Sequence, residues 1–244
     1  MPGQTLSGKS VLVTGGARRI GRAIALALAQ AGANVAITYR NSKVDAEETA
    51  REIEAAGVRA LVLPCDVGSE SSVKAAIASA HAQFGRLDVL VNNAAVFQST
   101  PLESITLEQW DEVFATNARG PFLVAREALP ALRAVAGRIV NIGSLGGLHA
   151  WSAHAHYCAS KAALHMLTQA MAKAFAPQVA VNCVAPGWID LDDQPADRAA
   201  HFAAKTPMRR NGTAEDIAAA VLFFAAGPHF ITGQVLAVDG GLGL

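Results

Sequence analysis

The fold class of this 244-residue chain is decided by one stretch near its start, Val11-Leu12-Val13-Thr14-Gly15-Gly16-Ala17-Arg18-Arg19-Ile20-Gly21. Its first three residues predict a buried strand, and the apolar periodicity from Ile20 to Ala31 predicts a helix. Glycines between a strand and a helix let backbone N–H groups and the helix N-terminus approach a pyrophosphate. The spacing differs from the G-x-G-x-x-G fingerprint, so a tight turn without a ligand is the alternative.

Apolar runs alternate with amphipathic segments through the rest of the chain, which predicts a doubly wound α/β sheet. Several strands are near-continuous apolar runs, as in parallel sheets covered on both faces. No linker or repeat divides the sequence, so we expect a single domain over residues 1–244. The predicted strands are Val11–Val13, Val35–Tyr39, Ala60–Leu63, Val89–Val91, Arg138–Ile142, Val179–Val184 and Val235–Val238. The predicted helices are Ile20–Ala31, Asp45–Ala56, Ser71–Phe84, Leu107–Asn117 continuing with a bend to about Val135, Tyr157–Phe175 and Ala214–Ala225.

Composition narrows the class of function. The formal net charge is zero and no long basic run exists, so a broad nucleic-acid surface is not expected. The longest apolar run, Ala218 to Ala226, is shorter than the roughly 20 residues that span a membrane, and Met1-Pro2-Gly3-Gln4 does not begin a signal peptide. Cys65, Cys158 and Cys183 match neither a disulfide framework nor zinc spacing. We therefore expect a cytoplasmic protein with reduced thiols and no resident metal.

A second informative feature is the pair Tyr157 and Lys161, four residues apart in a predicted helix and hence on one face. A free tyrosine has a pKa near ~10. A neighbouring positive charge favours the phenolate, so Tyr157 is a candidate for proton transfer near neutral pH. The alternative is a half-buried tyrosine beside a solvated lysine.

The end of the second predicted strand, Thr38-Tyr39-Arg40-Asn41, bears on cofactor choice. In dinucleotide-binding folds an acidic residue near this point binds the ribose 2′-OH of NAD. No acid is present here. Arg40 and Arg18 could instead bind a 2′-phosphate through charge-assisted hydrogen bonds. The sequence therefore favours NADPH over NADH, with two ordinary surface arginines as the alternative.

Taken together, these strings resemble the short-chain dehydrogenase/reductase family over the whole chain. The matching motifs are Thr14-Gly15 with Gly21, Asp66, Asn92-Asn93-Ala94, Asn117, Ser144, Tyr157, Lys161, Pro186-Gly187 and Val238-Asp239-Gly240-Gly241. The resemblance implies a Rossmann-type domain of about seven strands, an NADP(H) cofactor, a small-molecule substrate and a homotetramer. Its interfaces would use helices around Glu108–Leu132 and Tyr157–Phe175, and the C-terminal segment.

The resemblance also implies catalytic roles. Tyr157 would protonate the substrate oxygen as hydride arrives from the nicotinamide. Lys161 would hold the nicotinamide ribose and lower the pKa of Tyr157. Ser144 would orient the substrate oxygen, and Asn117 would anchor a water that links Lys161 to solvent. A helix bend at Asn117 and a simple loop hydroxyl at Ser144 are the structural alternatives.

The resemblance assigns further residues to the cofactor and substrate. Asp66 and Val67 would contact the adenine, Asn93 the adenine-ribose side, and the backbone of Ile189 the nicotinamide, because Asp190 stands where many relatives have threonine. The full cofactor set is Gly15, Arg18, Arg19, Ile20, Gly21, Tyr39, Arg40, Asp66, Val67, Asn93, Ala94, Tyr157, Lys161, Pro186, Gly187 and Ile189. The substrate set is Phe97, Ser144, Leu145, Trp151 and Tyr157, with His149, His154 and a loop at about 188–212 beside them.

Three details resemble the pteridine-reductase branch of the family: Arg19 at the usual middle glycine, Phe97 within Asn93–Leu102, and Asp192-Asp193-Gln194-Pro195 in the substrate loop. That branch typically carries aspartate where this chain has Ser144, so we favour reduction of a ketone or aldehyde, 3-oxoacyl compounds included. Pteridine reduction and a non-catalytic NADP(H) sensor are the alternatives. Asp190, Asp192 and Asp193 would either attract a cationic substrate or belong to a solvated lid. His154 and His156 would belong to a polar loop rather than a metal site.

Overall fold

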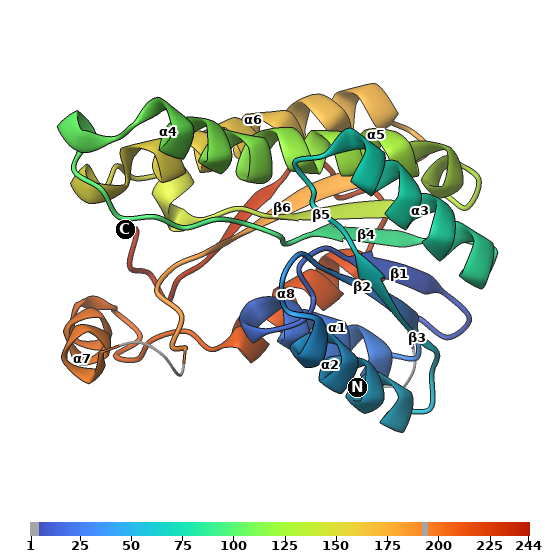
Figure 1. Cartoon of the computed structure of the whole chain (residues 1–244). Coiled ribbons are helices and arrows are strands. Elements are labelled where there is room, and N and C mark those ends of the chain that lie inside the picture. Colours follow the sequence, from blue (N-terminus) through green and yellow to red (C-terminus); the bar gives the residue numbers. More distant parts are fainter. Residues whose placement is uncertain (1–4, 192–194) are drawn as a thin grey trace.

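The computed structural model describes residues 5–191 and 195–244 (Figure 1). Within them seven parallel strands form one sheet in the order β3-β2-β1-β4-β5-β6-β7. The predicted doubly wound sheet is therefore confirmed. The expectations for Met1–Gln4 and for Asp192, Asp193 and Gln194 lie outside the described residues. The strands are β1 Ser10–Val13, β2 Asn34–Tyr39, β3 Ala60–Pro64, β4 Val89–Asn92, β5 Arg138–Ile142, β6 Ala180–Pro186 and β7 Val235–Val238.

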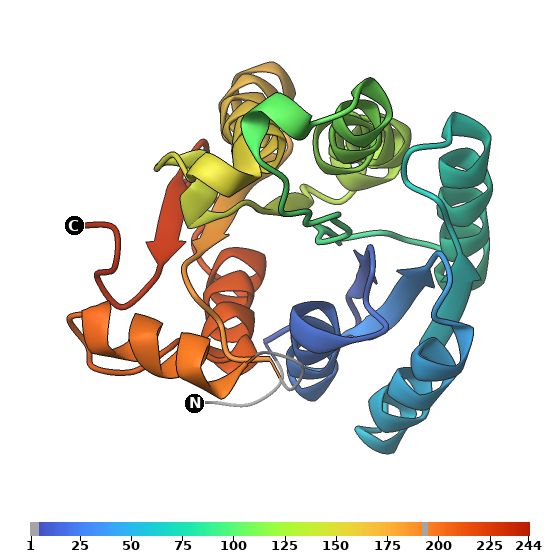
Figure 2. The ribbon, with the colours of Figure 1, turned by 60° about the vertical axis from the view of Figure 1, so that its left-hand side comes forward.

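Helices cover both faces of the sheet (Figures 1 and 2). One layer contains α1, α2 and α8, and the other contains α3, α5 and α6, with α4 against α6. The helices are α1 Arg19–Gln30, α2 Lys43–Ala55, α3 Glu70–Phe84, α4 Leu107–Phe114, α5 Gly120–Arg133, α6 Ala155–Phe175, α7 Ala196–Lys205 and α8 Ala214–Ala226. Among the described residues, none of these helices has the length and apolar character needed to cross a membrane.

The side-chain alternation of β1 explains why its sequence is apolar at every position. Val11 and Val13 point into the core beneath α1 and α8, whereas Leu12 points into the core beneath α3 and α5. All three are essentially inaccessible to solvent. Successive strand residues face opposite sides, so a strand covered on both faces needs apolar residues throughout.

The segment predicted as one bent helix from residue 107 to about 135 consists of α4 and α5 joined by a π-helical turn, Ala115–Arg119. Asn117 lies in that turn. Its amide exchanges two hydrogen bonds with the backbone of Val96, at 2.8 and 2.9 Å. The side chain thereby fixes the segment after β4 to the bend.

The order of the sheet reverses between β1 and β4, whose carboxyl ends lie side by side. In open α/β sheets, ligands bind in the crevice at such a switch point. Near this edge lies α7, a helix for which the sequence analysis gave no prediction. In Figures 1 and 2 it stands outside both helical layers.

Candidate active site

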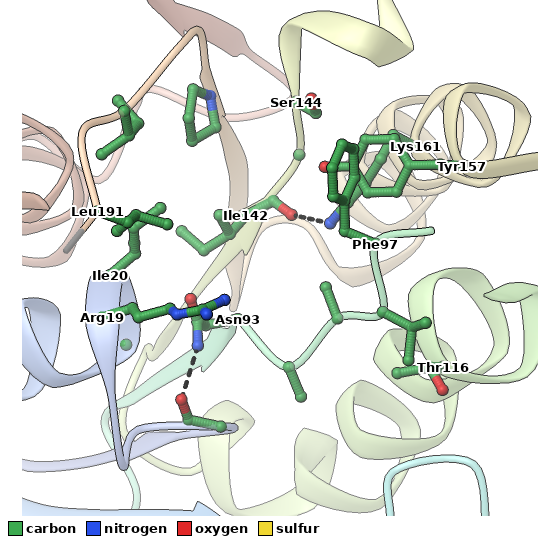
Figure 3. Close-up of a pocket in the computed structure, with 18 of the residues that line it drawn as sticks. Arg19, Ile20, Asn93, Phe97, Thr116, Ile142, Ser144, Tyr157, Lys161 and Leu191 are labelled. Carbon is green, nitrogen blue, oxygen red and sulfur yellow. Dashed lines mark hydrogen bonds between the residues drawn. The ribbon is translucent and has the colours of Figure 1, made fainter. Parts of the chain in front are cut away.

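A cavity of about 1040 Å³ runs along the carboxyl ends of the strands (Figure 3). Every residue predicted to bind the cofactor lines it, as do Phe97, Ser144, Trp151 and Tyr157. Asn117 and Leu145 are not among its lining residues. Leu145 is buried beside Gly243, in the position that a β-carbon on that glycine would need, so its assignment to the pocket wall is not met.

The glycine loop after β1 is built for close backbone approach. Gly15 has a φ of +64°, and its N–H donates to the hydroxyl of Thr38 at 3.2 Å. A β-carbon on Gly21 would strike the carbonyl oxygen of Gly15 and lie 2.5 Å from Nδ2 of Asn93. Arg19, which stands where the family usually has a glycine, adopts the left-handed φ of +51°.

Asn93 holds this loop together, which the sequence analysis did not predict. Its Nδ2 donates to the carbonyl oxygens of Thr14 and Gly15 at 3.0 and 2.9 Å. The amide is thus used by the protein backbone, although the residue still lines the cavity. Asp66 also lines the cavity, and its carboxylate accepts the N–H of Gly68 at 2.9 Å.

Two arginines flank the first turn of α1, which contains no acidic residue and no side-chain cap. Arg18 lies 3.9 Å from Asp45, and Arg40 lies 3.8 Å from Glu112. All four side chains are about half exposed. Such long, solvated ion pairs contribute little stability, so a phosphate can replace the carboxylates at small cost.

One face of α6 carries Tyr157 and Lys161, two of the predicted catalytic residues. Lys161 is 2% exposed, and its ammonium donates to the carbonyl oxygen of Ile142 at 2.7 Å (Figure 3). Burial lowers the pKa of Lys161 to about 8. Burial raises the pKa of Tyr157 to about 12, although its hydrogen bond with Ser144 acts in the opposite direction.

In this structure burial holds the pKa of Tyr157 above its ordinary value, and the lowering of that pKa by Lys161 stays a prediction. The ammonium bonds to a backbone carbonyl and lies 5.8 Å from the centre of the phenol ring. Desolvation of the phenolate outweighs the hydrogen bond from Ser144. The phenol consequently keeps its proton throughout the physiological pH range.

Aromatic side chains form the wall beside Tyr157. Phe97 is 57% exposed, stacks on His154 with ring centres 4.6 Å apart and makes a T-shaped contact with Tyr157 at 4.8 Å. The ring of Trp151 is nearly parallel to that of Tyr157, at 6.3 Å. The side chain of Asp190 accepts a hydrogen bond from Asn211 at 2.8 Å, and Asp190 does not line the cavity.

The wall formed by α7 was missed by sequence reasoning. Trp188 and Phe202 stack at 4.0 Å, and both line the cavity, as does Arg198. The sequence did contain a signal for this helix. An alanine-rich segment follows Pro195, and Phe202 lies three residues after Ala199, which is a helical spacing. Pro195 precedes the first turn, a position that suits proline.

The histidine pair His154 and His156 contacts Gln98. Nδ1 of His154 lies 2.8 Å from the backbone oxygen of Gln98, and Nε2 of His156 lies 3.3 Å from its side-chain oxygen. In the described part of the chain no group of three or more His, Cys, Asp or Glu is arranged to hold a metal ion. The pair fastens the Phe97 loop to the start of α6.

A family model described as enoyl-(acyl carrier protein) reductase matches residues 15–243. With this match and the relatives below, the chain belongs to the short-chain dehydrogenase/reductase family, as its motifs predict. It is 40% identical over 240 residues to a 3-oxoacyl-[acyl-carrier-protein] reductase of Staphylococcus aureus strain Mu50, covering 96% of this chain and 98% of the relative.

Two solved structures extend the comparison. A short-chain dehydrogenase/reductase from Serratia marcescens BCRC 10948 superposes with a TM-score of 0.94 at 36% identity, over 98% of this chain and 100% of the other. A blue fluorescent protein from a metagenomic library, in complex with NADPH, gives a TM-score of 0.92 at 40% identity, over 98% and 99%.

Proposed function

We propose that this protein is an NADPH-dependent oxidoreductase that reduces a ketone or aldehyde, 3-oxoacyl compounds included, to an alcohol. The observation that carries the proposal is the convergence of Tyr157, Ser144 and Lys161 on a cavity whose other end is a glycine loop flanked by arginines. The relative named as a 3-oxoacyl reductase and the relative bound to NADPH support the same reaction and cofactor.

The residues present fit NADPH. Gly15 and Gly21 leave the backbone open to a pyrophosphate at the N-terminus of α1, and Arg18 and Arg40 are placed for a 2′-phosphate. When bound, NADPH supplies the hydride. Lys161 commits one ammonium hydrogen to Ile142, so two remain for ribose hydroxyls.

Tyr157 is the proton donor in this proposal. Its raised pKa keeps the phenol protonated, and proton transfer from a positioned phenol neutralises the charge that develops on a carbonyl oxygen as it is reduced. The hydroxyl oxygen of Ser144 accepts the N–H of Gly146 at 3.0 Å. Its own hydrogen can then donate to the substrate oxygen. Asn117 positions the Val96 segment and Ser160 from below.

A dihydropteridine is the second candidate substrate, favoured by one observation. His154 stacks on one face of the Phe97 ring, and Phe97 is 57% exposed where it lines the cavity. A flat heteroaromatic ring stacks well on an exposed aromatic face. Ser144 weighs against this candidate, because a hydroxyl cannot supply the protonatable group that an aspartate would.

The proposal extends to the setting of the enzyme. It works as one domain, in the cytoplasm and as a homotetramer, without a nucleic-acid or membrane partner. Family membership over residues 15–243 and zero net charge support this setting. Light scattering of the purified chain tests the tetramer, and a monomer would contradict it.

The reaction is tested by NADPH oxidation with 3-oxoacyl thioesters, diketones, quinones, sugars and dihydrobiopterin. We expect turnover of at least one carbonyl, and a loss of about 100-fold or more in Tyr157→Phe, since general-acid catalysis typically contributes 10²–10⁴-fold. Ser144→Asp should improve pterin turnover if that residue alone selects against pterins. A wild-type enzyme as inert as Tyr157→Phe across the whole panel would overturn the enzymatic proposal.

A further inference from the structure

The face of α6 that carries Tyr157 and Lys161 continues for one more turn to His165. Residues four apart lie above one another on a helix, so the three side chains form one row. His165 is 6% exposed. Its Nε2 accepts the backbone N–H of Ser144 at 3.4 Å. The row therefore reaches the loop that follows β5 from beneath.

Two glycines of that loop make room for the imidazole. A β-carbon on Gly143 would collide with Nε2 of His165, and a β-carbon on Gly147 would lie 2.6 Å from its Cε1. The ring thus fills the space between the two glycines that bracket the loop. A change in its shape or polarity acts directly on the backbone of Ser144, which lies between them.

The loop is held at two neighbouring points by the same helix. Lys161 donates to the carbonyl oxygen of Ile142 at 2.7 Å, and His165 accepts from Ser144 two residues later. The hydroxyl of Ser144 is in turn tied to Gly146 at 3.0 Å. Helix α6 therefore sets the height of that hydroxyl relative to Tyr157, which the helix also carries.

The ring must be neutral to accept this hydrogen bond, with its proton on Nδ1. Burial, and then the charge of Lys161, lower the pKa of His165 to about 4. Cys183, the other titratable group beside Gly143, is an uncharged thiol, because burial raises its pKa to about 12. His165 thus acts as a fixed acceptor at neutral pH.

We propose that His165 is a positioning residue for carbonyl reduction, which accepts the N–H of Ser144 and thereby fixes the Ser144 hydroxyl beside Tyr157. The inference rests on the proposed function, because it requires Ser144 to bind the substrate oxygen. Its effect travels through Ser144 and does not involve contact with substrate.

Two substitutions of equal polarity test whether the position of the hydrogen-bond acceptor at residue 165 matters. In His165→Gln the amide oxygen can reach the place of Nε2, whereas in His165→Asn the shorter side chain cannot. We expect kcat to fall about 10- to 100-fold in His165→Asn, since small misplacements of reacting groups can cost about 10²-fold. His165→Gln should recover kcat to within a few-fold of wild type. The KM for NADPH should change little in both.

A double-mutant cycle with Ser144→Ala identifies the route of the effect. If His165 acts through Ser144, His165→Asn should lower kcat by less than about twofold in the Ser144→Ala background. Met171→Ala is the control for destabilisation. Met171 lies on the same helix and is 4% exposed, so the substitution removes buried packing. It should lower the thermal midpoint and leave kcat close to wild type.

The outcomes distinguish this proposal from the proposed function. Equal kcat in His165→Asn and His165→Gln, or an equal loss in both serine backgrounds, would overturn the role of His165. If Ser144→Ala alone leaves carbonyl reduction unchanged, the proposed role of Ser144 fails first. Should His165→Asn not fold, His165→Gln still decides: a loss of kcat as large as that in Ser144→Ala would contradict the proposal.

Discussion

Replacing Lys161 with methionine should make the protein more stable at pH 7 while abolishing carbonyl reduction. The pKa of Lys161 is about 8 in the folded chain, against an ordinary value of 10.5. This separation corresponds to a cost of about 3 kcal/mol for burying the ammonium, at roughly 1.4 kcal/mol per pH unit. Methionine leaves the carbonyl of Ile142 without its hydrogen-bond donor, which lowers the stability of the variant by about 1 kcal/mol. The net expectation is a gain of about 2 kcal/mol.

The sign of the pH dependence follows from proton binding. Between pH 8 and 10.5 the unfolded chain holds the Lys161 proton more tightly than the folded chain, so the wild type recovers stability as pH rises through this window. The advantage of Lys161→Met should therefore shrink by about 2 kcal/mol between pH 7 and pH 10.

The measurement is urea unfolding of both proteins at the two pH values, followed by circular dichroism. The charge of Lys161 also lowers the pKa of the buried Cys183 thiol, so both proteins are compared in the Cys183→Ala background. Tyr157 titrates in both, and the difference between the two curves then isolates Lys161. Protein concentration must be held constant, because association would add to apparent stability. Lys173→Met, at an exposed position of the same helix, is the matched control and should stay within about 0.5 kcal/mol.

Two results would refute the reasoning. If Lys161→Met is less stable than wild type at pH 7, the ammonium is not desolvated as the structure indicates. If the difference is the same at pH 7 and pH 10, Lys161 does not titrate in the predicted window.

If Arg40 binds the 2′-phosphate as proposed, Arg40→Ala should raise the KM for NADPH about 10- to 100-fold with little change for NADH, since hydrogen bonds to charged groups contribute about 1.5–3 kcal/mol. Parallel increases for both cofactors would contradict the phosphate contact. Glu112→Gln should lower the KM for NADPH, because it removes the carboxylate 3.8 Å from Arg40; an unchanged KM in steady-state assays would show that the ion pair does not compete. Gly21→Ala should prevent NADP⁺ from raising the thermal midpoint, because its β-carbon would strike the carbonyl of Gly15; a normal shift would count against the close-approach argument. The kcat/KM for reduction should fall above about pH 8 as Lys161 loses its proton, and a limb unmoved in Lys161→Arg would assign it elsewhere.

The fold was predictable because the apolar sequence of each central strand indicates that helices cover both of its faces. Val89–Val91 is apolar at every position, which is the pattern of a strand with helices on both faces. Strand ends were less accurate. Prediction ended β6 at Val184, but pairing with β7 continues through Pro186, because proline is tolerated where a strand ends.

The site was predictable in its membership more than in its physical state. Spacing brought Ser144, Tyr157 and Lys161 to one cavity. It did not reveal that burial raises the pKa of Tyr157, because desolvation depends on atoms far away in sequence. The cavity wall at α7 and the contact between His165 and Ser144 were missed for a similar reason. An alanine-rich segment and a lone histidine acquire meaning only from the tertiary contacts they make.

The row of Tyr157, Lys161 and His165 on α6 is separate from the segments that form the walls of the cavity. The proposed chemical step and the choice of substrate could therefore be engineered independently. Helix α6 carries the proposed proton donor and the lysine beside it, whereas the aromatic walls of the cavity come mainly from the Phe97 loop, Trp151 and the Trp188–Phe202 stack at α7. If these walls contact the substrate, grafting them from a relative should change which ketones are accepted without disturbing the chemical step. The family resemblance over the entire chain is compatible with such grafting, since the scaffold that holds α6 is shared.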